Sequence, residues 1–200
     1  MTTAGLDLSV TYPGVVGSAD EEAALVHALA RGEAAAVGDV YDVHHEAIRA
    51  FALRLVGDAS AAEDLVHEVF LTLPRAIRRY EGRSSLRTFL ISIAVNHARH
   101  YVRSAARRRA ALDKLAVVPG RNGPVDPERS FQQAQLAQLL SAGLDTLSLD
   151  QRVAFVLCEV EERNSREVAG IVGVPEATVR TRLFHAKKKL RTFLEKRGLE

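Results

Sequence analysis

Five helix-breaking residues lie close together near the middle of this chain, at Pro119, Gly120, Gly123, Pro124 and Pro127. Proline has no backbone N–H to donate and clashes with the preceding helical turn, and glycine makes a helix costlier to order. We therefore expect no regular element to run through this stretch, which is typical of a flexible linker. The sequence predicts a linker over residues 113–130, between a first domain at 20–112 and a second at 131–200. Residues 1–19, which contain three glycines and a proline, are predicted to form a disordered tail.

Apolar residues recur at steps of three and four positions on both sides of the linker. Such steps place side chains on one side of an α-helix, and no convincing strand-like alternation occurs. In the first domain the spacing predicts a helix that ends near Gly57 and another that begins at Asp58 or Ser60. Pro74 is expected to kink or end that second helix, whose apolar face contains Leu65, Val69 and Leu73. We predict an all-α protein made of two small helical domains.

Charge is segregated along the chain, although the net charge is only +2. From Asp20 to Leu73 there are eleven acids and three bases, whereas from Arg75 to Arg109 there are ten arginines and one acid. From Glu176 to the end, eight bases stand against three acids. This pattern predicts two contacts with a polyanion and one contact of the acidic part with a basic partner surface.

Composition excludes several classes of protein. Cys158 is the only cysteine, so no intramolecular disulfide and no paired-cysteine metal or redox motif is possible. No apolar run approaches the ~18 to 20 residues of a membrane span, and the first nineteen residues lack the features of a signal peptide. We expect a cytoplasmic protein with no stable membrane insertion, no metal and no cofactor.

Residues 165–183 carry the pattern of a helix-turn-helix. Ala169 is small where two helices would cross, Gly173 suits a left-handed turn, and Pro175 suits the first turn of the second helix. With Val179 and Leu183 facing inward, the outward face is expected to read a DNA major groove; it holds Arg180, Thr181, Phe184, His185 and Lys188, with Arg182 better placed for phosphates. The alternative is a solvated basic helix without a ligand.

The arginine-rich block of the first domain differs in kind. Ser84 or Ser85 can begin a basic helix there, and aromatic and polar side chains accompany it: Tyr80, Phe89, Asn96, His97 and Tyr101. Aromatic rings next to basic residues favour binding of unpaired bases, because the rings stack on bases while the cations follow the backbone. The alternative is a cationic helix whose aromatic residues belong to the core.

Three runs of sequence together resemble the extracytoplasmic-function (ECF) sigma factors of bacterial RNA polymerase. They are AEDLVHEVFL at 62–71, YEGRSSLRTFLISIAVNHARHYV at 80–102 and SREVAGIVGVPEATVRTRLFHAKKKL at 165–190. The resemblance implies a region 2 domain that binds the polymerase and melts the minus-10 promoter element, and a region 4 domain that reads the minus-35 element. It implies the partners of that family: core RNA polymerase through its beta and beta-prime subunits, promoter DNA in duplex and single-stranded form, and an anti-sigma factor. No catalytic activity is implied.

The resemblance also assigns roles to residues by position. It implies polymerase binding by Asp64, Leu65, His67 and Glu68. The pocket for a flipped minus-10 base is implied to be formed or bordered by Tyr80, Ser84, Ser85, Ile93, Asn96 and His97, with Arg87, Arg99 and Arg103 near the DNA backbone. Minus-35 reading is implied for Arg180, Thr181, Arg182, Phe184 and His185, and Lys188 lies on the same face. Three residues depart from the family pattern: His67 stands for the common glutamine, Pro74 for an aromatic residue or helix former, and His185 for arginine.

Two other functions are compatible with parts of the sequence. Asp64, His67 and Glu68 have the i, i+3, i+4 spacing of a metal site in a nuclease, but no second ligand helix accompanies them. His97 and His100 raise the same question. A conventional regulator that binds operator DNA as a dimer would use the helix-turn-helix, but it leaves the acidic segment and the arginine-rich block without a role.

Overall fold

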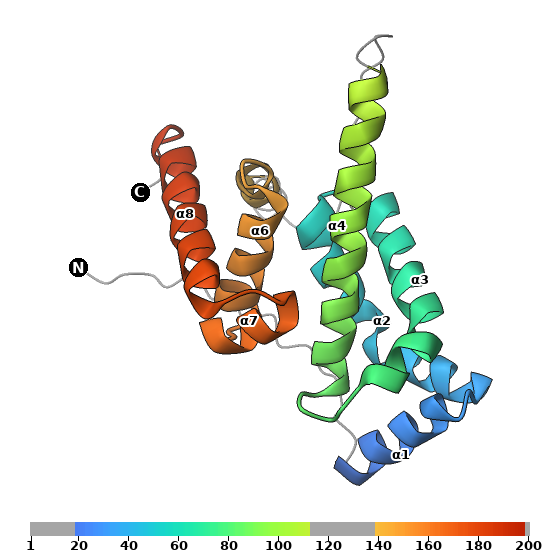
Figure 1. The fold of residues 1–200 in the computed structure, drawn as a ribbon. Coiled ribbons are helices and arrows are strands. Elements are labelled where there is room, and N and C mark those ends of the chain that lie inside the picture. Colours follow the sequence, from blue (N-terminus) through green and yellow to red (C-terminus); the bar gives the residue numbers. More distant parts are fainter. Residues whose placement is uncertain (1–18, 113–138, 199–200) are drawn as a thin grey trace, which may run out of the picture.

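The computed structural model describes residues 19–112 and 139–198, and every regular element in these ranges is a helix (Figure 1). The N-terminal module consists of α1 (Ala19–Ala30), α2 (Ala34–Val56), α3 (Ala59–Ala76), a short 3-10 helix (Ile77–Arg79) and α4 (Leu86–Leu112). The C-terminal module contains a helical segment at 139–145 and then α6 (Leu149–Phe155), a π-helix (Val156–Val160), α7 (Ser165–Val172) and α8 (Glu176–Glu195). The all-α fold is confirmed. The predicted linker at 113–130 lies outside the described residues, as does nearly all of the predicted tail.

The boundary between α2 and α3 lies where the sequence predicts it. Gly57 adopts the left-handed conformation with φ 71°, and its N–H donates to the Leu53 carbonyl at 2.8 Å. The Asp58 side chain then accepts a hydrogen bond from the Ala61 N–H at 2.8 Å. Glycine adopts the left-handed conformation at position 57 without strain, because it has no Cβ. Aspartate at position 58 accepts a hydrogen bond from an N–H in the first turn of α3 that has no partner within the helix. These two caps bring α2 and α3 together as an antiparallel pair.

Helix α3 does not end at Pro74, contrary to one of the two expected effects of that residue. The helix continues to Ala76 and then tightens into the 3-10 helix. Leu73 and Ile77, on either side of the proline, are both buried in the core. Their packing offsets the hydrogen bond that proline removes from the last turn.

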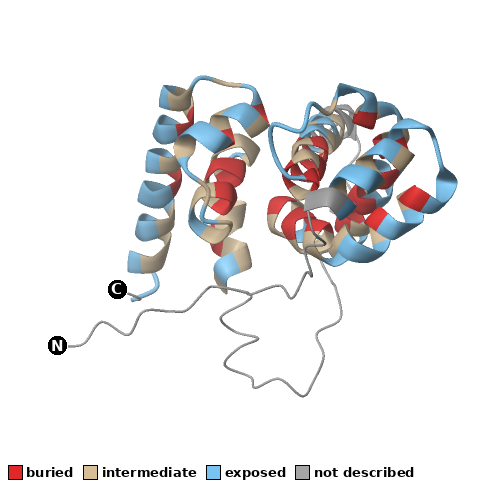
Figure 2. Ribbon diagram, turned by 90° about the horizontal axis from the view of Figure 1, so that it is seen from below, coloured by how far each residue is buried: buried red, intermediate tan, exposed pale blue. Residues whose placement is uncertain are grey.

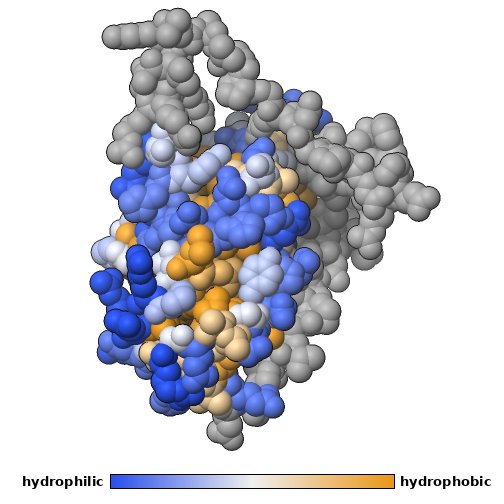
Figure 3. Space-filling model, turned by 90° about the vertical axis from the view of Figure 1, so that its right-hand side faces the viewer, coloured by the Kyte–Doolittle hydropathy of each residue, from blue (hydrophilic) through white to orange (hydrophobic). Residues whose placement is uncertain are grey.

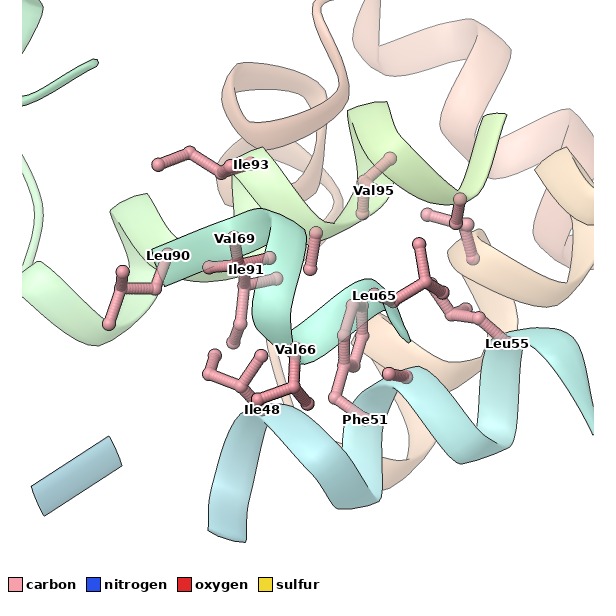
Figure 4. Packing of buried hydrophobic residues seen from close by; sticks show 14 of the residues in the cluster. Ile48, Phe51, Leu55, Leu65, Val66, Val69, Leu90, Ile91, Ile93 and Val95 are labelled. Carbon is pink, nitrogen blue, oxygen red and sulfur yellow. The ribbon is translucent and has the colours of Figure 1, made fainter. Parts of the chain in front are cut away.

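The core of the N-terminal module is formed by apolar side chains from three helices. Figure 4 shows Ile48 and Phe51 of α2 facing Val66 and Val69 of α3, with Ile91 of α4 above them. All five are almost completely buried. This core fixes α4 against the α2–α3 pair and therefore fixes the position of the arginine-rich helix.

The C-terminal module contains the predicted helix-turn-helix. Asn164 and Glu167 form a reciprocal capping box at the start of α7, and Gly173 makes the left-handed turn with φ 68°. Val168 and Val179 are fully buried between the helices. Pro175 stands just before α8 as its N-cap rather than within the first turn. The turn geometry that the sequence predicts is confirmed.

The two modules pack against each other. Helix α7 contacts α4, and α6 contacts α2, so that the helix-turn-helix lies beside the arginine-rich helix (Figure 1). Buried residues of both modules form one connected cluster that includes Val95 and Val153. Figure 2 shows buried residues in both modules and exposed residues around their outer sides.

Candidate nucleic-acid interface

The loop before α4 is held by a carboxylate from the first helix. Oε1 of Glu22 accepts a hydrogen bond from the Leu86 N–H at 2.8 Å and another from the Tyr80 hydroxyl at 3.4 Å. The Tyr80 hydroxyl also contacts the Ser84 carbonyl. Ser85, the residue before α4, caps the start of the helix, because its Oγ accepts from the Thr88 N–H at 3.3 Å. Helix α1 therefore sets the shape of the loop at 80–85.

Tyr80 is partly buried in this loop, and its ring packs against Phe89 with centroids 5.1 Å apart. Burial is the main cause that raises the pKa of the Tyr80 hydroxyl, and the charge and hydrogen bond of Glu22 raise it further. Ser84 and Ser85 are exposed next to the ring. The loop thus presents a neutral phenol and two hydroxyl-bearing residues at the start of a basic helix.

The middle of α4 carries Asn96 and His97 on adjacent positions with different surroundings. Asn96 is exposed, whereas His97 is partly buried and its Nε2 hydrogen-bonds to Thr72 Oγ1 of α3 at 3.0 Å. Burial lowers the pKa of His97, the charge of Glu68 opposes this shift, and His100 adds to it. The amide of Asn96 is accessible to a ligand, whereas His97 is turned toward α3 and held there by Thr72.

The predicted site residue Ile93 lies in the core beneath the surface of α4. Its side chain is only 7% exposed and belongs to the core cluster. The reason is the helical register, since Ile93 lies four residues after Phe89, which also packs against the core. Ile93 can support a pocket from below but offers almost no surface to a base.

The predicted backbone-contacting arginines of α4 have unlike surroundings. Arg103 is exposed, and its Nε donates to the Arg99 carbonyl at 3.2 Å. Arg87 and Arg99 are partly buried, and each forms an ion pair with a carboxylate of the C-terminal module: Arg87 with Glu161 at 2.6 Å and Arg99 with Asp150 at 3.4 Å. Two of the three cations are therefore engaged within the molecule.

Helix α8 presents its predicted reading face to solvent. Phe184 is 64% exposed, and its ring meets that of His185 edge-on with centroids 5.5 Å apart. Thr181 and Lys188 are also exposed. Arg180 pairs with Glu176 at 2.5 Å one turn earlier, whereas Arg182 turns inward to Asp150 at 2.6 Å. The face is suited to a groove because its cations and its aromatic ring lie on one side of a rigid helix.

A basic groove continues this surface between α8 and the start of α6. Its volume is about 520 Å³, and lysines are the most frequent residue along it; it is lined by Thr146, Gln151, His185, Lys188, Lys189, Thr192, Phe193 and Lys196. Lys189 Nζ donates to Gln151 Oε1 at 3.0 Å. The lysines give this edge of the module the charge that DNA phosphates require.

The outward face of α3 contains three of the four predicted polymerase-binding residues. Asp64, His67 and Glu68 are exposed, and His67 Nδ1 hydrogen-bonds to the Glu63 carbonyl at 3.1 Å. The fourth, Leu65, is 3% exposed, because the spacing that it shares with Val69 and Leu73 turns it into the core. Leu71, by contrast, is 73% exposed. Figure 3, which looks at the side of the molecule where α3 lies in Figure 1, shows an apolar strip between hydrophilic residues.

Two absences among the described residues concern a metal site, which a nuclease would need, and a membrane-spanning helix. Within the ranges 19–112 and 139–198, no group of three or more His, Cys, Asp or Glu side chains is arranged to hold a metal ion. The helices of the same ranges include none with the length and apolar character needed to cross a membrane.

Several residues of the interface could not be identified from the sequence. Glu22, Asp150 and Glu161 approach arginines or amides that lie 32 to 74 positions away. Thr72 reaches His97 from another helix. The acidic excess before Leu73 was the only signal for Glu22. No local signal marked Asp150 or Glu161.

Comparison with known proteins gives two family matches in chain order. Residues 40–108 match the family profile Sigma-70 region 2, and residues 137–190 match Sigma-70, region 4. The first match runs from within α2 to within α4, and the second includes the helix-turn-helix.

Curated relatives and solved structures agree with these matches. The ECF RNA polymerase sigma factor SigE of Mycolicibacterium smegmatis is 31% identical over 159 residues, which are 78% of this chain and 61% of that protein. The ECF RNA polymerase sigma-E factor of Escherichia coli K12 is 31% identical over 134 residues, 64% of this chain and 70% of that protein. The sigma factor RpoE of Bartonella quintana, solved in complex with the anti-sigma factor NepR, has a similar fold. Its TM-score is 0.63 at 24% identity, with 79% of this chain and 96% of that chain covered.

Proposed function

Because the chain belongs to the ECF sigma factors of the sigma-70 family, we propose that it binds core RNA polymerase and directs it to specific promoters. In this proposal the C-terminal module reads the minus-35 element as duplex and the N-terminal module opens the minus-10 element. The observation that carries it is the presence, in one chain, of an exposed helix-turn-helix reading face and a basic helix that follows an aromatic loop. Neither the nuclease nor the dimeric regulator needs both surfaces.

Minus-35 recognition is assigned to the outer face of α8. Arg180 can donate two hydrogen bonds to guanine, and Phe184 and Thr181 can contact thymine methyl groups. Lys188 and the lysines of the adjacent groove supply phosphate contacts that position the helix without reading sequence. Arg182 belongs to the same surface once its carboxylate partner is displaced.

Minus-10 melting is assigned to the loop at 80–85 and the exposed middle of α4. Unstacking one base costs a few kcal/mol, which stacking and hydrogen bonds to the captured base must offset. Tyr80 offers a ring and Asn96 an amide for that purpose. Arg87, Arg99 and Arg103 are proposed to follow the phosphates on either side.

Polymerase docking is assigned to the exposed face of α3. Asp64, His67 and Glu68 supply hydrogen-bonding groups, and Leu71 supplies apolar surface beside them. An exposed leucine next to acidic side chains favours a protein partner with a basic, partly apolar surface. The imidazole of His67 keeps a hydrogen bond to such a partner possible.

An anti-sigma factor is proposed as a second protein partner, since the Bartonella quintana relative in its solved structure is bound to one. We also propose that the chain has no catalytic activity of its own and acts in the cytoplasm, where polymerase and promoters are found.

Transcription in vitro tests the proposed function directly. The purified chain is added to core RNA polymerase and a promoter library, and the start sites of the transcripts are sequenced. We expect a set of start sites that depends on the chain, with a shared upstream element. A chain that does not bind core polymerase, or that leaves the start sites unchanged, would contradict the proposal; cleavage of DNA in the presence of a divalent metal would favour the nuclease.

A further inference from the structure

Three exposed arginines lie together at the end of α3 and in the 3-10 helix that follows it. They are Arg75, in the last turn of α3, and Arg78 and Arg79, in the 3-10 helix. Among residues 19–112 and 139–198, none of the three guanidinium groups has an ion-pair or hydrogen-bond partner. Arg75, Arg78 and Arg79, hereafter the arginine patch, thus carry positive charge that the described residues do not neutralise.

Other arginines of the N-terminal module are engaged within the molecule. They pair with carboxylates on their own or on neighbouring elements: Arg49 with Glu63, Arg83 with Glu81, Arg87 with Glu161 and Arg99 with Asp150. Of the three arginines of α4 that are assigned to the DNA backbone, two are therefore already paired. The arginine patch differs from them because its charge is available to a ligand.

The register of the helix directs the arginine patch to solvent. Leu73 and Ile77 are buried in the core, and the three arginines, at positions i, i+3 and i+4, share the opposite side. The Tyr80 N–H donates to the Ile77 carbonyl at 2.9 Å, and α1 contacts the 3-10 helix. Figure 1 shows this end of α3, the loop at 80–85 and α1 grouped at one end of the N-terminal module. The patch is thus fixed beside the loop that is assigned to base capture.

Stabilisation of α3 accounts for only part of the arginine patch. A cation in the last turn of a helix interacts favourably with the helix dipole, and this effect fades beyond that turn. Arg75 lies in the last turn of α3, whereas Arg78 and Arg79 lie after its end at Ala76. Like charges at neighbouring positions repel each other, so the two further arginines raise the energy of the free protein. Such an arrangement favours an anionic ligand.

A nucleic-acid strand is the anion that fits this position best. The planar guanidinium group can donate two hydrogen bonds to one phosphate, and the phosphates along a strand match several arginines in a row. Neighbouring residues have Cα atoms about 3.8 Å apart. A strand whose base meets Tyr80 therefore brings a flanking phosphate within reach of Arg79 and Arg78.

We propose that the arginine patch binds the phosphates of the unpaired strand on the α3 side of the loop at 80–85, whereas α4 binds those on its other side. The strand then crosses the loop, and the captured base lies between two cationic segments. This inference rests on the proposed function. It adds a contact outside α4 that does not depend on base sequence, because phosphates carry no sequence information.

The test uses holoenzyme made from core RNA polymerase and the full chain. The patch variant is Arg78→Gln with Arg79→Gln. The matched control is Arg166→Gln with Arg191→Gln, which removes the same charge at exposed positions of α7 and α8. The probe is a fluorescein-labelled promoter fragment from the transcription experiment, in which mismatches hold the minus-10 bases open and the minus-35 element is removed. Without that element, α7 and α8 have no duplex to read.

We expect the patch variant to lose part of the salt dependence of probe binding. Each phosphate contact with a single strand contributes about 0.7 to the slope of log affinity against log salt concentration, so two lost contacts should lower the slope by about 1.4. The same loss makes binding roughly 25-fold weaker than in the control at about 0.1 M salt. Trimming the open strand from one end, but not from the other, should abolish the difference. Equal slopes in the variant and the control, or a difference that survives trimming from either end, would overturn the proposal.

Three further outcomes separate this proposal from other roles. If the patch variant binds core polymerase more weakly than the control, the patch faces the polymerase and the proposal is wrong. If the variant unfolds at a lower urea concentration but keeps the salt slope, the patch serves only the stability of α3. Arg78→Lys with Arg79→Lys keeps the charge and should retain the slope; a slope as low as that of the glutamine variant would also contradict the proposal.

Transcription by the wild-type chain separates this inference from the proposed function. If wild-type holoenzyme starts RNA synthesis at specific promoters while the patch variant and the control bind the probe alike, only the role of the arginine patch is wrong. If the wild-type chain does not redirect the polymerase, the proposed function itself is wrong.

Discussion

The two basic helices of this molecule, α4 and α8, differ in how their ligand-binding side chains are supported. On α8, Phe184, His185 and Lys188 project from a single helix into solvent. On α4 and the loop before it, Tyr80 is held by Glu22 of α1, and His97 by Thr72 of α3. Arg87 is held by Glu161 of the C-terminal module.

This difference matches the two forms of DNA that the helices are proposed to bind. Duplex DNA presents its edges in a regular groove, so that one rigid helix face can read it. An unpaired base must be removed from its stack and enclosed, which requires groups from several elements in fixed positions. We therefore expect substitutions around α4 to act through its neighbours, and substitutions on α8 to act locally.

The largest expected effect comes from a contact between the modules. Arg152→Ala should lower the free energy of unfolding by about 3 kcal/mol, because it leaves the buried Leu55 carbonyl without its donor and removes the ion pair between Arg152 and Asp145. Urea unfolding measures this change. Arg191→Ala, at an exposed position of α8, is the control and should leave stability nearly unchanged. If both variants lose a similar amount of stability, the contacts of Arg152 with Leu55 and Asp145 do not stabilise the fold more than an exposed arginine does.

The next effect concerns the free face of α8. Arg180→Ala should weaken binding of holoenzyme to the upstream promoter element by about 1 to 3 kcal/mol while leaving melting intact. The measurement is holoenzyme affinity for promoters with native and scrambled upstream elements. An unchanged preference for the native element would exclude Arg180 from the reading set.

Asn96→Ala should act on melting alone. We expect open-complex formation to fall by about tenfold, the loss of roughly one hydrogen-bonded base contact, with unchanged affinity for core polymerase. Permanganate footprinting of the minus-10 element and a core-binding assay give the two readouts. If open-complex formation and affinity for core polymerase fall equally, Asn96 stabilises the fold and does not bind the captured base.

Substitutions of Glu22 test whether α1 supports the loop at 80–85. Glu22→Ala should lower the free energy of unfolding by about 1 kcal/mol, since it removes the acceptor of the Leu86 N–H at the start of α4. Open-complex formation should fall because the loop at 80–85 loses its anchor. Glu22→Gln retains an acceptor oxygen and should recover most of both losses. Failure of this rescue would mean that the charge of Glu22, and not its hydrogen bond, matters.

The smallest expected effect is a pH dependence at His97. Burial lowers its pKa in the folded state, so the unfolded chain takes up the proton first as the pH falls below about 6.5. Stability should therefore be greatest above that pH and decline toward about pH 5. His97→Gln should reduce the decline, and His44, whose pKa burial also lowers, should account for part of the remainder. Urea unfolding above about pH 6.5 and at about pH 5 measures this decline in the free energy of unfolding. If the stability of His97→Gln declines as steeply as that of the wild type, the prediction is wrong.

Features set by neighbouring residues could be predicted from the sequence. The cap at Asp58, the turn at Gly173 and the exposed Phe184 all follow from spacing and backbone preference. The roles predicted for Leu65 and Ile93 follow position in the resembling family, whereas their burial follows helical spacing. The spacing of Leu65 with Val69 already indicates a buried face.

Contacts between distant parts of the chain could not be predicted. Glu22 meets Leu86 across 64 positions, and Glu161 meets Arg87 across 74. Such pairs depend on how whole helices pack, and a lone acid carries no local mark of its partner. The family resemblance, which concerns residues 62–71, 80–102 and 165–190, contains none of these acids.

The hydrogen bonds of Glu22 bear on where the smallest working unit of the N-terminal module begins. The region 2 match starts at residue 40, so a fragment cut to that boundary would lack α1 altogether. In such a fragment the Leu86 amide would lose its acceptor, and the Tyr80 hydroxyl would keep only the Ser84 carbonyl. The segment that must be kept to study base capture in isolation therefore starts upstream of the matched residues, at α1.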